Sequence, residues 1–429
     1  MPNSPVSRRL NRINPTLFSA YCIIAAFGTY FCMYAFRKPF TAATYEGITW
    51  LGIGFKTVLI SSQVAGYTIS KFIGIRVVSE LPTRYCSISI LALIAIAEVA
   101  LLLFAVTPAP WSFIWLFVNG LPLGMVFGLV LRFLEGREVT EALSAGLCAS
   151  FIVSSGFVKS VGSSLIVDYD VSPNWMPFLT GLIFIIPLLI CVWMLSQIPP
   201  PSEADQKSRS KRTTMDSNQR KAFFRRHKFG IICLLIVYVF LTIVRSLRDD
   251  FAVEIWQELG VHDTPDVFAK SEFWVMLGVI FIMGLTIVIR NNRTAFLSSM
   301  GLLGVGFVIM VMSVGGQLLG WLSPMAFMVL LGLGMYIPYV AYHTTVFERM
   351  FAAFKETGTI GYLMYLADAV GYLGYVGVMV FRNTTGSQIN FLSLLVGISL
   401  CVAVLSTVVT IVLGTYYAKA IPVEKGTSV

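Results

Sequence analysis

Long apolar stretches of about 20 residues recur along the whole chain, and short polar segments separate them. A helix needs about 20 consecutive apolar residues to cross the hydrocarbon core of a bilayer. Apolar residues run continuously instead of alternating with polar ones, which argues against a transmembrane β-barrel. The pattern predicts twelve membrane-spanning helices, at 16–42, 53–75, 85–107, 111–132, 142–167, 174–197, 229–257, 271–290, 294–316, 322–347, 358–381 and 388–417.

The composition supports an integral membrane protein with little room for a soluble domain. Of the 429 residues, 56% are hydrophobic and 12% are charged, whereas soluble domains carry about 25% charged residues. The seven cysteines are scattered and the three histidines are isolated, so no metal-ligand spacing appears. We also find no glycine-rich phosphate loop and no nucleophile–base pattern. We therefore expect neither an enzyme nor a protein with a metal or another cofactor.

The net charge of +9 is concentrated in one segment. The stretch from Pro199 to Lys228 holds nine Lys and Arg residues against three acids. The other basic residues gather in loops on the same predicted side, and acidic residues gather in the opposite loops. The positive-inside rule then places both termini and the central segment in the cytoplasm, in a bacterial-type inner membrane. We interpret the basic segment as a solvated linker near anionic lipid, and we expect no nucleic-acid partner.

The linker divides the chain into three regions, residues 1–197, 198–228 and 229–429, with six predicted helices on each side. The two halves share a pattern, because Arg37 ends the apolar stretch of the first helix and Arg245 ends that of the seventh. Parallel halves related by an axis along the membrane normal characterise one large class of secondary transporters, which bind their substrate at the midplane. The pattern therefore predicts alternating access between two pseudo-symmetric bundles.

Arg37 and Arg245 are the strongest candidates for a binding site. A charge at bilayer depth costs about 3 kcal/mol on insertion scales, so it indicates function by default. Two guanidinium forks facing one another across a water-filled cavity suit a tetrahedral dianion. Their mutual repulsion would make reorientation of an unloaded carrier slow, which is the behaviour of an exchanger. The alternatives are that Arg37 reaches the headgroups and that Arg245 pairs locally with Asp249 at i, i+4.

The length of the first helix determines whether Arg37 can reach the headgroups. If it continues past Pro39 toward Tyr45, Arg37 lies well below the membrane surface. Such a helix is long, but its length suits a tilted span.

Further charged residues lie inside or at the ends of the apolar stretches. Lys159 is a candidate cavity cation, and Lys71 and Lys38 either contact the solute or extend toward the headgroups. Asp368 is a candidate counter-ion or proton relay. Arg248 and Asp249 are candidates for ion pairs after Arg245.

Tyrosines accompany these charges at helical spacing. Tyr30 and Tyr34 share a helical face with Arg37, and Tyr67 precedes Lys71 by one turn. Tyr372 belongs to a tyrosine stripe in the eleventh helix. A tyrosine hydroxyl in hydrocarbon needs a partner, so these side chains either line a polar cavity or pack between helices.

Four segments resemble organophosphate:phosphate antiporters of the major facilitator superfamily, the glycerol phosphate and hexose phosphate carriers. They are "YFCMYAFRKPF", "YTISKFIG", "YVFLTIVRSLRDDF" and "VGYLGY". The resemblance implies that Arg37 and Arg245 hold the phosphoryl group and that Lys38 lies at the edge of the cavity. It also implies that the cavity is lined or gated by Tyr30, Tyr34, Tyr67, Lys71 and Tyr372.

The chain also departs from that family, which indicates a remote branch. Lys159 stands where glycerol phosphate carriers have a substrate histidine, and Asp368 and Arg248 have no counterpart. We therefore expect an all-α integral membrane transporter of an organic anion, preferably phosphorylated and exchanged for inorganic phosphate, with a monomer as the expected unit. The alternatives are a proton-coupled symporter that uses Asp368 and a transporter-like sensor of a phosphorylated solute.

Overall fold

A computed structural model describes residues 4–134, 137, 140–200, 217–262, 264–286, 289, 291–354, 360–384 and 390–421. Most of the expected linker lies outside these described residues. The described chain is almost entirely helical. A two-residue-per-strand hairpin, β1 (Thr49–Trp50) and β2 (Ile53–Gly54), is the only sheet within it.

Six long helices form the first half of the molecule, after a short helix α1 (Pro5–Leu10). The first of them ends in two 3₁₀ turns, η1 (Tyr34–Phe36) and η2 (Pro39–Ala42). The six are α2 (Pro15–Met33), α3 (Phe55–Glu80), α4 (Thr83–Val106), α5 (Phe113–Leu131), α6 (Thr140–Val167) and α7 (Met176–Ser196).

Six further spans follow the short helix α9 (Ser217–Arg226), and two of them are broken. The first continues from α10 (Lys228–Asp250) into α11 (Ala252–Glu258). The fourth runs from α14 (Pro324–Ala341) through a π-helical turn, η3 (Tyr342–Val346), into α15 (Phe347–Ala353). The unbroken ones are α12 (Val267–Thr286), α13 (Asn292–Leu318), α16 (Ile360–Thr384) and α17 (Phe391–Ala420).

The twelve expected spans correspond to these twelve helical segments. Eleven are long and apolar enough to cross a membrane among the residues that the structure describes. The twelfth is α3, which has 26 residues but carries polar side chains such as Gln63 and Lys71 in its interior. It packs between α5 and α16, so its polar residues face protein. Exposed apolar side chains, such as Ile88, Ile186 and Phe281, cover the outside of other helices, as expected for a surface that faces lipid.

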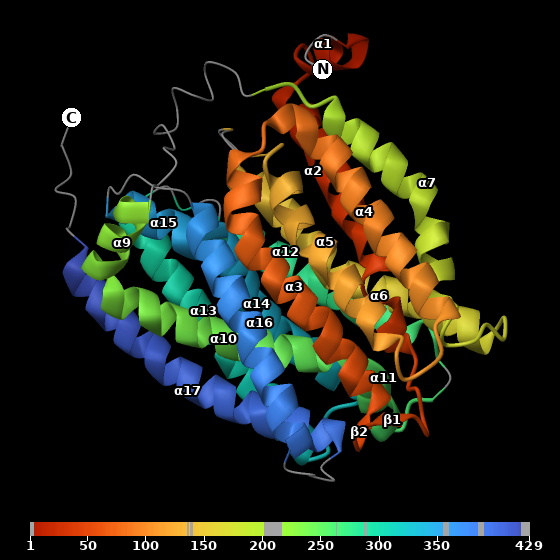
Figure 1. Cartoon of the computed structure of the whole chain (residues 1–429). Coiled ribbons are helices and arrows are strands. Elements are labelled where there is room, and N and C mark those ends of the chain that lie inside the picture. The colour runs from red at the N-terminus through yellow and green to blue at the C-terminus, as the bar shows by residue number, and fades with distance from the viewer. Residues whose placement is uncertain are drawn as a thin grey trace, which may run out of the picture.

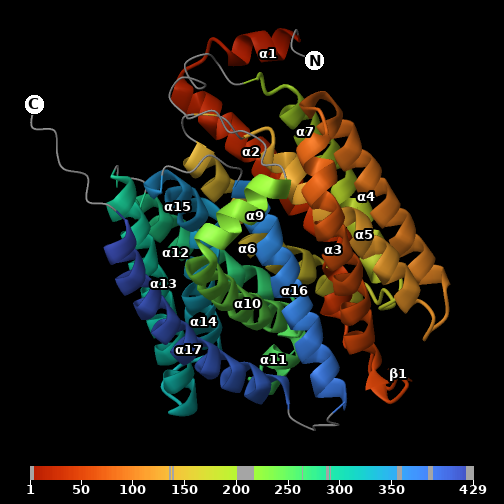
Figure 2. The same cartoon turned by 60° about the vertical axis from the view of Figure 1, so that its left-hand side comes forward.

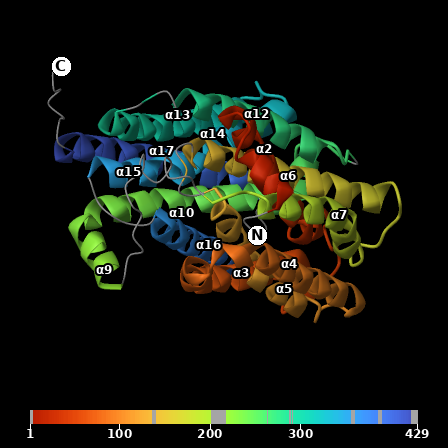
Figure 3. The same ribbon diagram turned by 90° about the horizontal axis from the view of Figure 1, so that it is seen from above.

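The two halves lie side by side, with the first largely on the right of Figure 1 and the second largely on the left. Helix α2 begins and α17 ends at the same end of the bundle, and the β-hairpin and α11 lie at the other (Figures 1 and 2). We call these the termini end and the hairpin end. The view along the bundle shows α3 beside α16 where the halves meet (Figure 3).

The packing between the halves repeats with twofold symmetry. Helix α3 packs against α16, and α6 packs against α12. Counted along the chain, α3 and α16 are spans 2 and 11, and α6 and α12 are spans 5 and 8. Spans 2 and 8 occupy corresponding positions in the two halves, and so do spans 5 and 11. The two contacts are therefore equivalent. An axis along the membrane normal between parallel halves produces this relation. The expected pair of pseudo-symmetric six-helix bundles is therefore confirmed.

The expected continuous first helix is wrong. Helix α2 ends at Met33, and the chain continues through η1 and η2, with Arg37 between them. Pro39 lacks the backbone N–H that would donate to the Ala35 carbonyl in a continuous helix. Arg37 is nevertheless buried, because protein rather than hydrocarbon surrounds this broken segment.

Part of the expected solvated linker is a docked helix. In α9, the Phe223 ring stacks on Phe351 with centroids 4.7 Å apart, and Phe223 is buried. Arg225 and Arg226 occupy its last turn. The end of the 198–228 segment is therefore attached to the second half, whereas residues 201–216 lie outside the description.

Candidate anion-binding site

Arg37 and Arg245 meet at one tyrosine hydroxyl. Arg37 Nη2 lies 3.4 Å from Tyr372 Oη, and Arg245 Nη2 lies 2.9 Å from the same oxygen. The arginines come from the two halves, and Tyr372 comes from α16. Only 3% of Arg37 and 4% of Arg245 is exposed. The hydroxyl oxygen therefore marks a buried point at which one acceptor receives hydrogen bonds from both halves.

Aromatic rings occupy the space around both guanidinium groups. The Arg37 guanidinium carbon lies 3.8 Å from the centroid of the Tyr67 ring, and that of Arg245 lies 4.7 Å from the Tyr339 centroid. The negative face of an aromatic ring attracts a cation, but it uses none of the N–H donors in the plane of the fork. The Nε atoms of Arg37 and Arg245 have no hydrogen-bond partner. Donor capacity therefore remains at both groups.

Two amides fix the backbone that carries Arg37. Gln63 Nε2 donates to the Arg37 carbonyl at 2.8 Å, and Asn119 Nδ2 donates to the Phe36 carbonyl at 2.9 Å. Asn119 Oδ1 also accepts from Gln63 at 2.7 Å. The broken helix leaves carbonyl groups without helical partners, and these amides satisfy them. Sequence reasoning missed both residues, because a lone amide in an apolar stretch gives no pattern.

The cavity beside Arg245 is small. Its volume is about 20 Å³, which is room for about one water molecule. Within the described part of the chain, this space is therefore far smaller than the expected water-filled cavity. Tyr30 and Tyr34 do line the space, as expected, and their rings meet edge to face at 5.6 Å. The complete lining comprises Tyr30, Tyr34, Tyr67, Lys71, Phe127, Phe151, Arg245, Tyr339, His343, Asp368 and Tyr372.

An ion pair between the halves closes one side of this cavity. Lys71 Nζ lies 2.8 Å from Asp368 Oδ2. Tyr238 donates its hydroxyl to the other carboxylate oxygen, and His343 Nε2 lies 3.8 Å from that oxygen. No role at this site was expected for His343 from the sequence. The π-helical turn brings it to the site, and no periodicity in the sequence reveals such a turn.

A second cluster joins the halves toward the hairpin end. We define the hairpin-end cluster as Lys38 and Lys159 of the first half with Asp249 and Asp250 of the second. Lys38 Nζ lies 2.6 Å from Asp249 Oδ2 and also contacts Asp250. Lys159 contacts the Asp249 carboxylate and its backbone carbonyl. Asp249 thus faces the first half, and the alternative of a local Arg245–Asp249 pair is not found.

Two more ion pairs complete the buried charges near the site. Lys56 Nζ lies 2.7 Å from Glu254 Oε1, again across the halves. Arg248 Nη1 lies 2.5 Å from Glu272 Oε1, and its Nη2 donates to the Met328 carbonyl at 2.9 Å. Lys56 and Glu272 were not expected from the sequence, because their partners are far along the chain. Glu254 was expected only as part of a local ion cluster, but it pairs with Lys56 of the other half.

The charges around the site balance except at the two arginines. Two lysines face two aspartates in the hairpin-end cluster, and three further pairs are one to one: Lys56–Glu254, Lys71–Asp368 and Arg248–Glu272. Among the described residues, no carboxylate forms an ion pair with Arg37 or Arg245. Lys38, Lys71 and Lys159 were expected to contact the solute, but acids of the second half bind them in this form.

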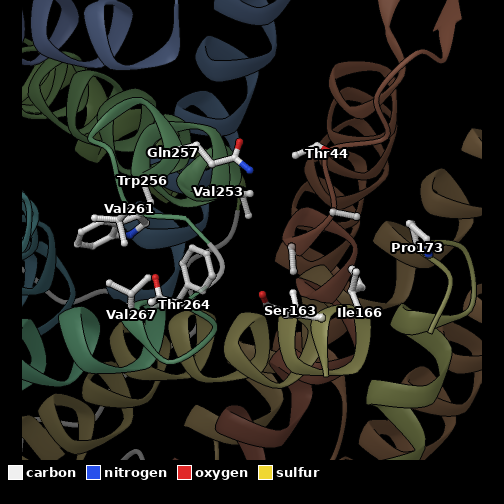
Figure 4. Close-up of a pocket in the computed structure, with 14 residues that line it drawn as sticks. Thr44, Ser163, Ile166, Pro173, Val253, Trp256, Gln257, Val261, Thr264 and Val267 are labelled. Carbon is white, nitrogen blue, oxygen red and sulfur yellow. The ribbon is translucent and has the colours of Figure 1, made fainter. Parts of the chain in front are cut away.

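A larger cavity of about 200 Å³ lies on the hairpin-end side of the cluster. Ser163 and Ile166 of α6 face it from one side, and Trp256 and Gln257 of α11 face it from the other (Figure 4). No charged side chain lines it. Ser163 is one turn beyond Lys159 on α6, so the hairpin-end cluster separates this cavity from the arginines. It therefore lies between the halves without access to the cations.

Comparison with known proteins places the chain in a fold and a family. The profile described as "Family of unknown function (DUF5690)" matches residues 39–420. No curated protein matches the chain. Among solved structures, the crystal structure of a D-xylose-proton symporter is similar, with a TM-score of 0.56 and 15% identity over 96% of this chain and 100% of that chain. This likeness shows the fold alone, and the expected major facilitator fold is confirmed. The expected likeness to organophosphate antiporters stays a prediction.

Proposed function

The chain belongs to the DUF5690 family, and we propose that it is a secondary active transporter of an organic anion, with phosphorylated metabolites as the preferred substrate class. One observation carries this proposal. Arg37 and Arg245 are buried, they point at one acceptor oxygen, and they lack the carboxylate partners that neutralise the neighbouring cations. A buried pair of uncompensated cations is costly, and a dianion between them would remove that cost.

The geometry favours a phosphoryl group over a halide or a single carboxylate. An arginine fork donates two parallel hydrogen bonds to a pair of oxygens, and a phosphoryl group can offer oxygens to two forks at once. In the proposed complex, phosphoryl oxygens stand where Tyr372 Oη now accepts. Tyr30, Tyr34 and Tyr67 then form the wall beside the solute, as proposed from the family resemblance.

Alternating access follows from the ion pairs that join the halves. We propose that residues 1–197 and 229–429 move as two bodies connected by 198–228. The hairpin-end cluster and Lys56–Glu254 close the hairpin end, and Lys71–Asp368 lies on the other side of the arginines. Opening either end requires that its pairs separate. The positive-inside rule orients the termini end toward the cytoplasm of an inner membrane.

We further propose exchange with inorganic phosphate. An empty carrier must bring two unneutralised guanidinium groups together each time it passes through the closed form, whereas a loaded carrier brings together a neutral assembly. The Coulomb term is large in a dry site. Loaded reorientation is therefore faster, which makes influx depend on a bound anion for the return step.

Proton-coupled symport is the second candidate. Asp368 is buried between the halves beside Lys71, and buried carboxylates of this kind serve as proton relays in transporters. A symporter would move labelled substrate into empty vesicles when a pH gradient is imposed. An exchanger would require substrate or phosphate inside the vesicle.

The test begins with purified protein and a panel of anions. We expect inorganic phosphate and small phosphate monoesters to raise the Tm, whereas neutral sugars do not, because ligand binding to the folded state stabilises it. The substitution Arg37→Ala or Arg245→Ala should abolish this rise.

A matched control removes a buried ion pair without touching the arginines. In the double variant Lys56→Met, Glu254→Gln the phosphate-dependent rise in Tm should persist, because both charges of a balanced pair are lost together. Stabilisation by neutral sugars alone, or full stabilisation of both arginine variants by phosphate, would contradict the proposal.

A further inference from the structure

His343 lies at the site but has no role in holding an anion. Its Nδ1 is 2.9 Å from the Tyr339 carbonyl oxygen, one helical turn earlier. Its Nε2 is 3.4 Å from Tyr238 Oη and 3.8 Å from Asp368 Oδ1. The π-helical turn holds the ring between the backbone of its own helix and the carboxylate of α16. The imidazole therefore has one end fixed and one end directed at a charge.

The fixed end determines the tautomer. A carbonyl oxygen accepts hydrogen bonds and cannot donate, so Nδ1 must carry the hydrogen that lies between them. In a neutral imidazole the other nitrogen then bears the lone pair. Nε2 is therefore the atom that receives a proton when His343 becomes charged.

The groups around Nε2 leave it without a donor in the neutral state. Tyr238 has one hydroxyl hydrogen, and that hydrogen goes to Asp368 Oδ1. A neutral Nε2 thus presents its lone pair toward a carboxylate oxygen. Once protonated, Nε2 donates toward that same oxygen. The repulsion between the lone pair and the carboxylate is then replaced by an attraction between the imidazolium and the carboxylate.

Charged and titratable groups reach this place from several helices. Asp368 Oδ1 lies 3.8 Å from Nε2, and Lys71 of α3 and Arg245 of α10 line the same small cavity. Helices α5 and α6 contribute the rings of Phe127 and Phe151, with centroids 6.0 Å and 5.9 Å from the imidazole. Further titratable groups on the helices packed here are Tyr238 on α10, Tyr339 on its own helix and the buried Cys148 of α6.

We propose that His343 Nε2 is a proton-binding site that competes with Lys71 for Asp368. The proton comes from the aqueous phase, and the single bond formed is Nε2–H. Lys71 belongs to the first half, and both His343 and Asp368 belong to the second. Protonation therefore supplies Asp368 with a cation from its own half and weakens the ion pair that holds the halves together. The coupling of this site to transport depends on the proposed function, whereas proton binding itself does not.

The neighbours should move the titration in opposite directions. The substitution Lys71→Met removes a nearby cation, so His343 no longer competes with a lysine for Asp368. Protonation of His343 should therefore occur at a pH about one to three units higher. Asp368→Asn removes the anion and should lower that pH. Lys270→Met, which removes an exposed lysine near the start of α12, is the control and should leave it unchanged.

Nitrogen NMR of protein labelled with ¹⁵N-histidine tests the proposal directly. The chain has three histidines, so loss of one signal set in His343→Gln assigns the residue. We expect a hydrogen on Nδ1 at high pH, protonation of Nε2 as the pH falls, and the opposite shifts described above. If Asp368→Asn does not fold, Tyr238→Phe replaces it and should raise the pH of protonation, because the carboxylate loses a donor.

Three results would overturn the proposal. They are a hydrogen on Nε2 at high pH, no protonation over the whole pH range in which the protein stays folded, and a Lys71→Met titration identical to the wild type. The measurement needs no anion. A protein that titrates as expected but is not stabilised by phosphate esters would refute the proposed function alone, and the reverse pattern would refute this inference alone.

Discussion

At the scale of single residues, Arg37 and Arg245 differ from the other buried cations near them because neither has a carboxylate partner among the described residues. Each paired cation has a carboxylate from another segment, so removing such a residue leaves an unmatched charge. Arg37 and Arg245 have a hydroxyl and aromatic rings in place of a carboxylate. These partners lower the energy of the cations without cancelling their charge, which keeps them available to an anion.

Tyr372→Phe tests the role of the shared hydroxyl. The hydroxyl accepts from both guanidinium groups in the ligand-free protein, and a hydrogen bond from a charged donor contributes about 1.5–3 kcal/mol. We expect the ligand-free variant to unfold at a lower temperature, and a saturating phosphate ester to restore more stability than it adds to the wild type. Paired thermal scans measure this difference. An equal loss of Tm with and without ligand would contradict the role.

The sequence singled out Arg37, Arg245 and their tyrosines, which the structure brings together, because charges and hydroxyls in apolar stretches are exceptional. Their role in binding stays a prediction. The sequence was insufficient to assign partners. Lys159 had the surroundings of a cavity cation, yet Asp249 binds it from 90 positions away. Gln63, Asn119 and His343 gave no signal, because their roles depend on a helix break and a π-helical turn that place them beside residues far along the chain.

At the scale of elements, breaks in the helices create the site. The end of α2 at Met33 places Arg37 and Lys38 on 3₁₀ turns, where the first side chain reaches Tyr372 and the second reaches the hairpin-end cluster. Apolar periodicity predicted that a span exists here, but it continued the helix through Pro39. Length and hydropathy locate spans well, whereas a break that tertiary contacts satisfy leaves the hydropathy unchanged.

Asp249→Asn tests whether the hairpin-end cluster keeps that end closed. The substitution leaves Lys38 and Lys159 with one carboxylate between them, so their repulsion should favour separation of the halves. In a chain whose seven native cysteines are replaced, a cysteine at Ala252 beside the cluster should react with a bulky maleimide at least about tenfold faster, as for a shift of 1.4 kcal/mol.

The exposed pair Asp266–Lys270 provides the control for that experiment. Its side chains are 60% and 63% exposed, and surface pairs contribute little. Asp266→Asn should leave the labelling rate unchanged. Equal rates in wild type and Asp249→Asn would show that the cluster does not govern access.

Close packing of α3 on α5 positions Tyr67 and Lys71. A Cβ atom at Gly120 would lie 2.2 Å from the Gln63 carbonyl oxygen and 2.9 Å from the Tyr67 nitrogen. We expect Gly120→Ala to cost about 1–3 kcal/mol in stability and to weaken anion binding, because the backbone of α3 must move.

Gly304→Ala is the control for Gly120→Ala, because nothing lies within 4 Å of its Cβ position. Thermal unfolding with and without phosphate measures both effects. Unchanged stability in Gly120→Ala, or equal losses in the two variants, would contradict this account of the packing.

At the scale of the whole molecule, the halves are held together by charge on both sides of the arginines. The cavity beside Arg245 is too small for an organic solute, so entry of the proposed substrate would require that one set of pairs separates. The fold class and the twofold repeat were predictable from twelve apolar stretches and a central linker. The closed state was not, because it depends on pairs formed between halves that share no local sequence pattern.

Counterflow in vesicles tests the proposed exchange. We expect labelled phosphate to enter phosphate-loaded vesicles at least about tenfold faster than empty ones, because an unloaded carrier must pass through the closed form with two unneutralised cations. Vesicles containing Arg245→Ala protein supply the background. Equal uptake into empty and loaded vesicles would exclude exchange as the transport mode, and uptake that depends on an imposed pH gradient would favour the symporter.

The central claim is that both guanidinium groups hold one anion. Equilibrium binding of radiolabelled inorganic phosphate to purified protein tests it most directly, in the wild type, Arg37→Lys, Arg245→Lys and the double variant. We predict one phosphate per chain and about 10- to 100-fold weaker binding in each single variant, because lysine keeps the charge but loses the paired donors. The affinity of the double variant for phosphate should be only slightly lower than that of either single variant. Wild-type affinity in either single variant would contradict the account.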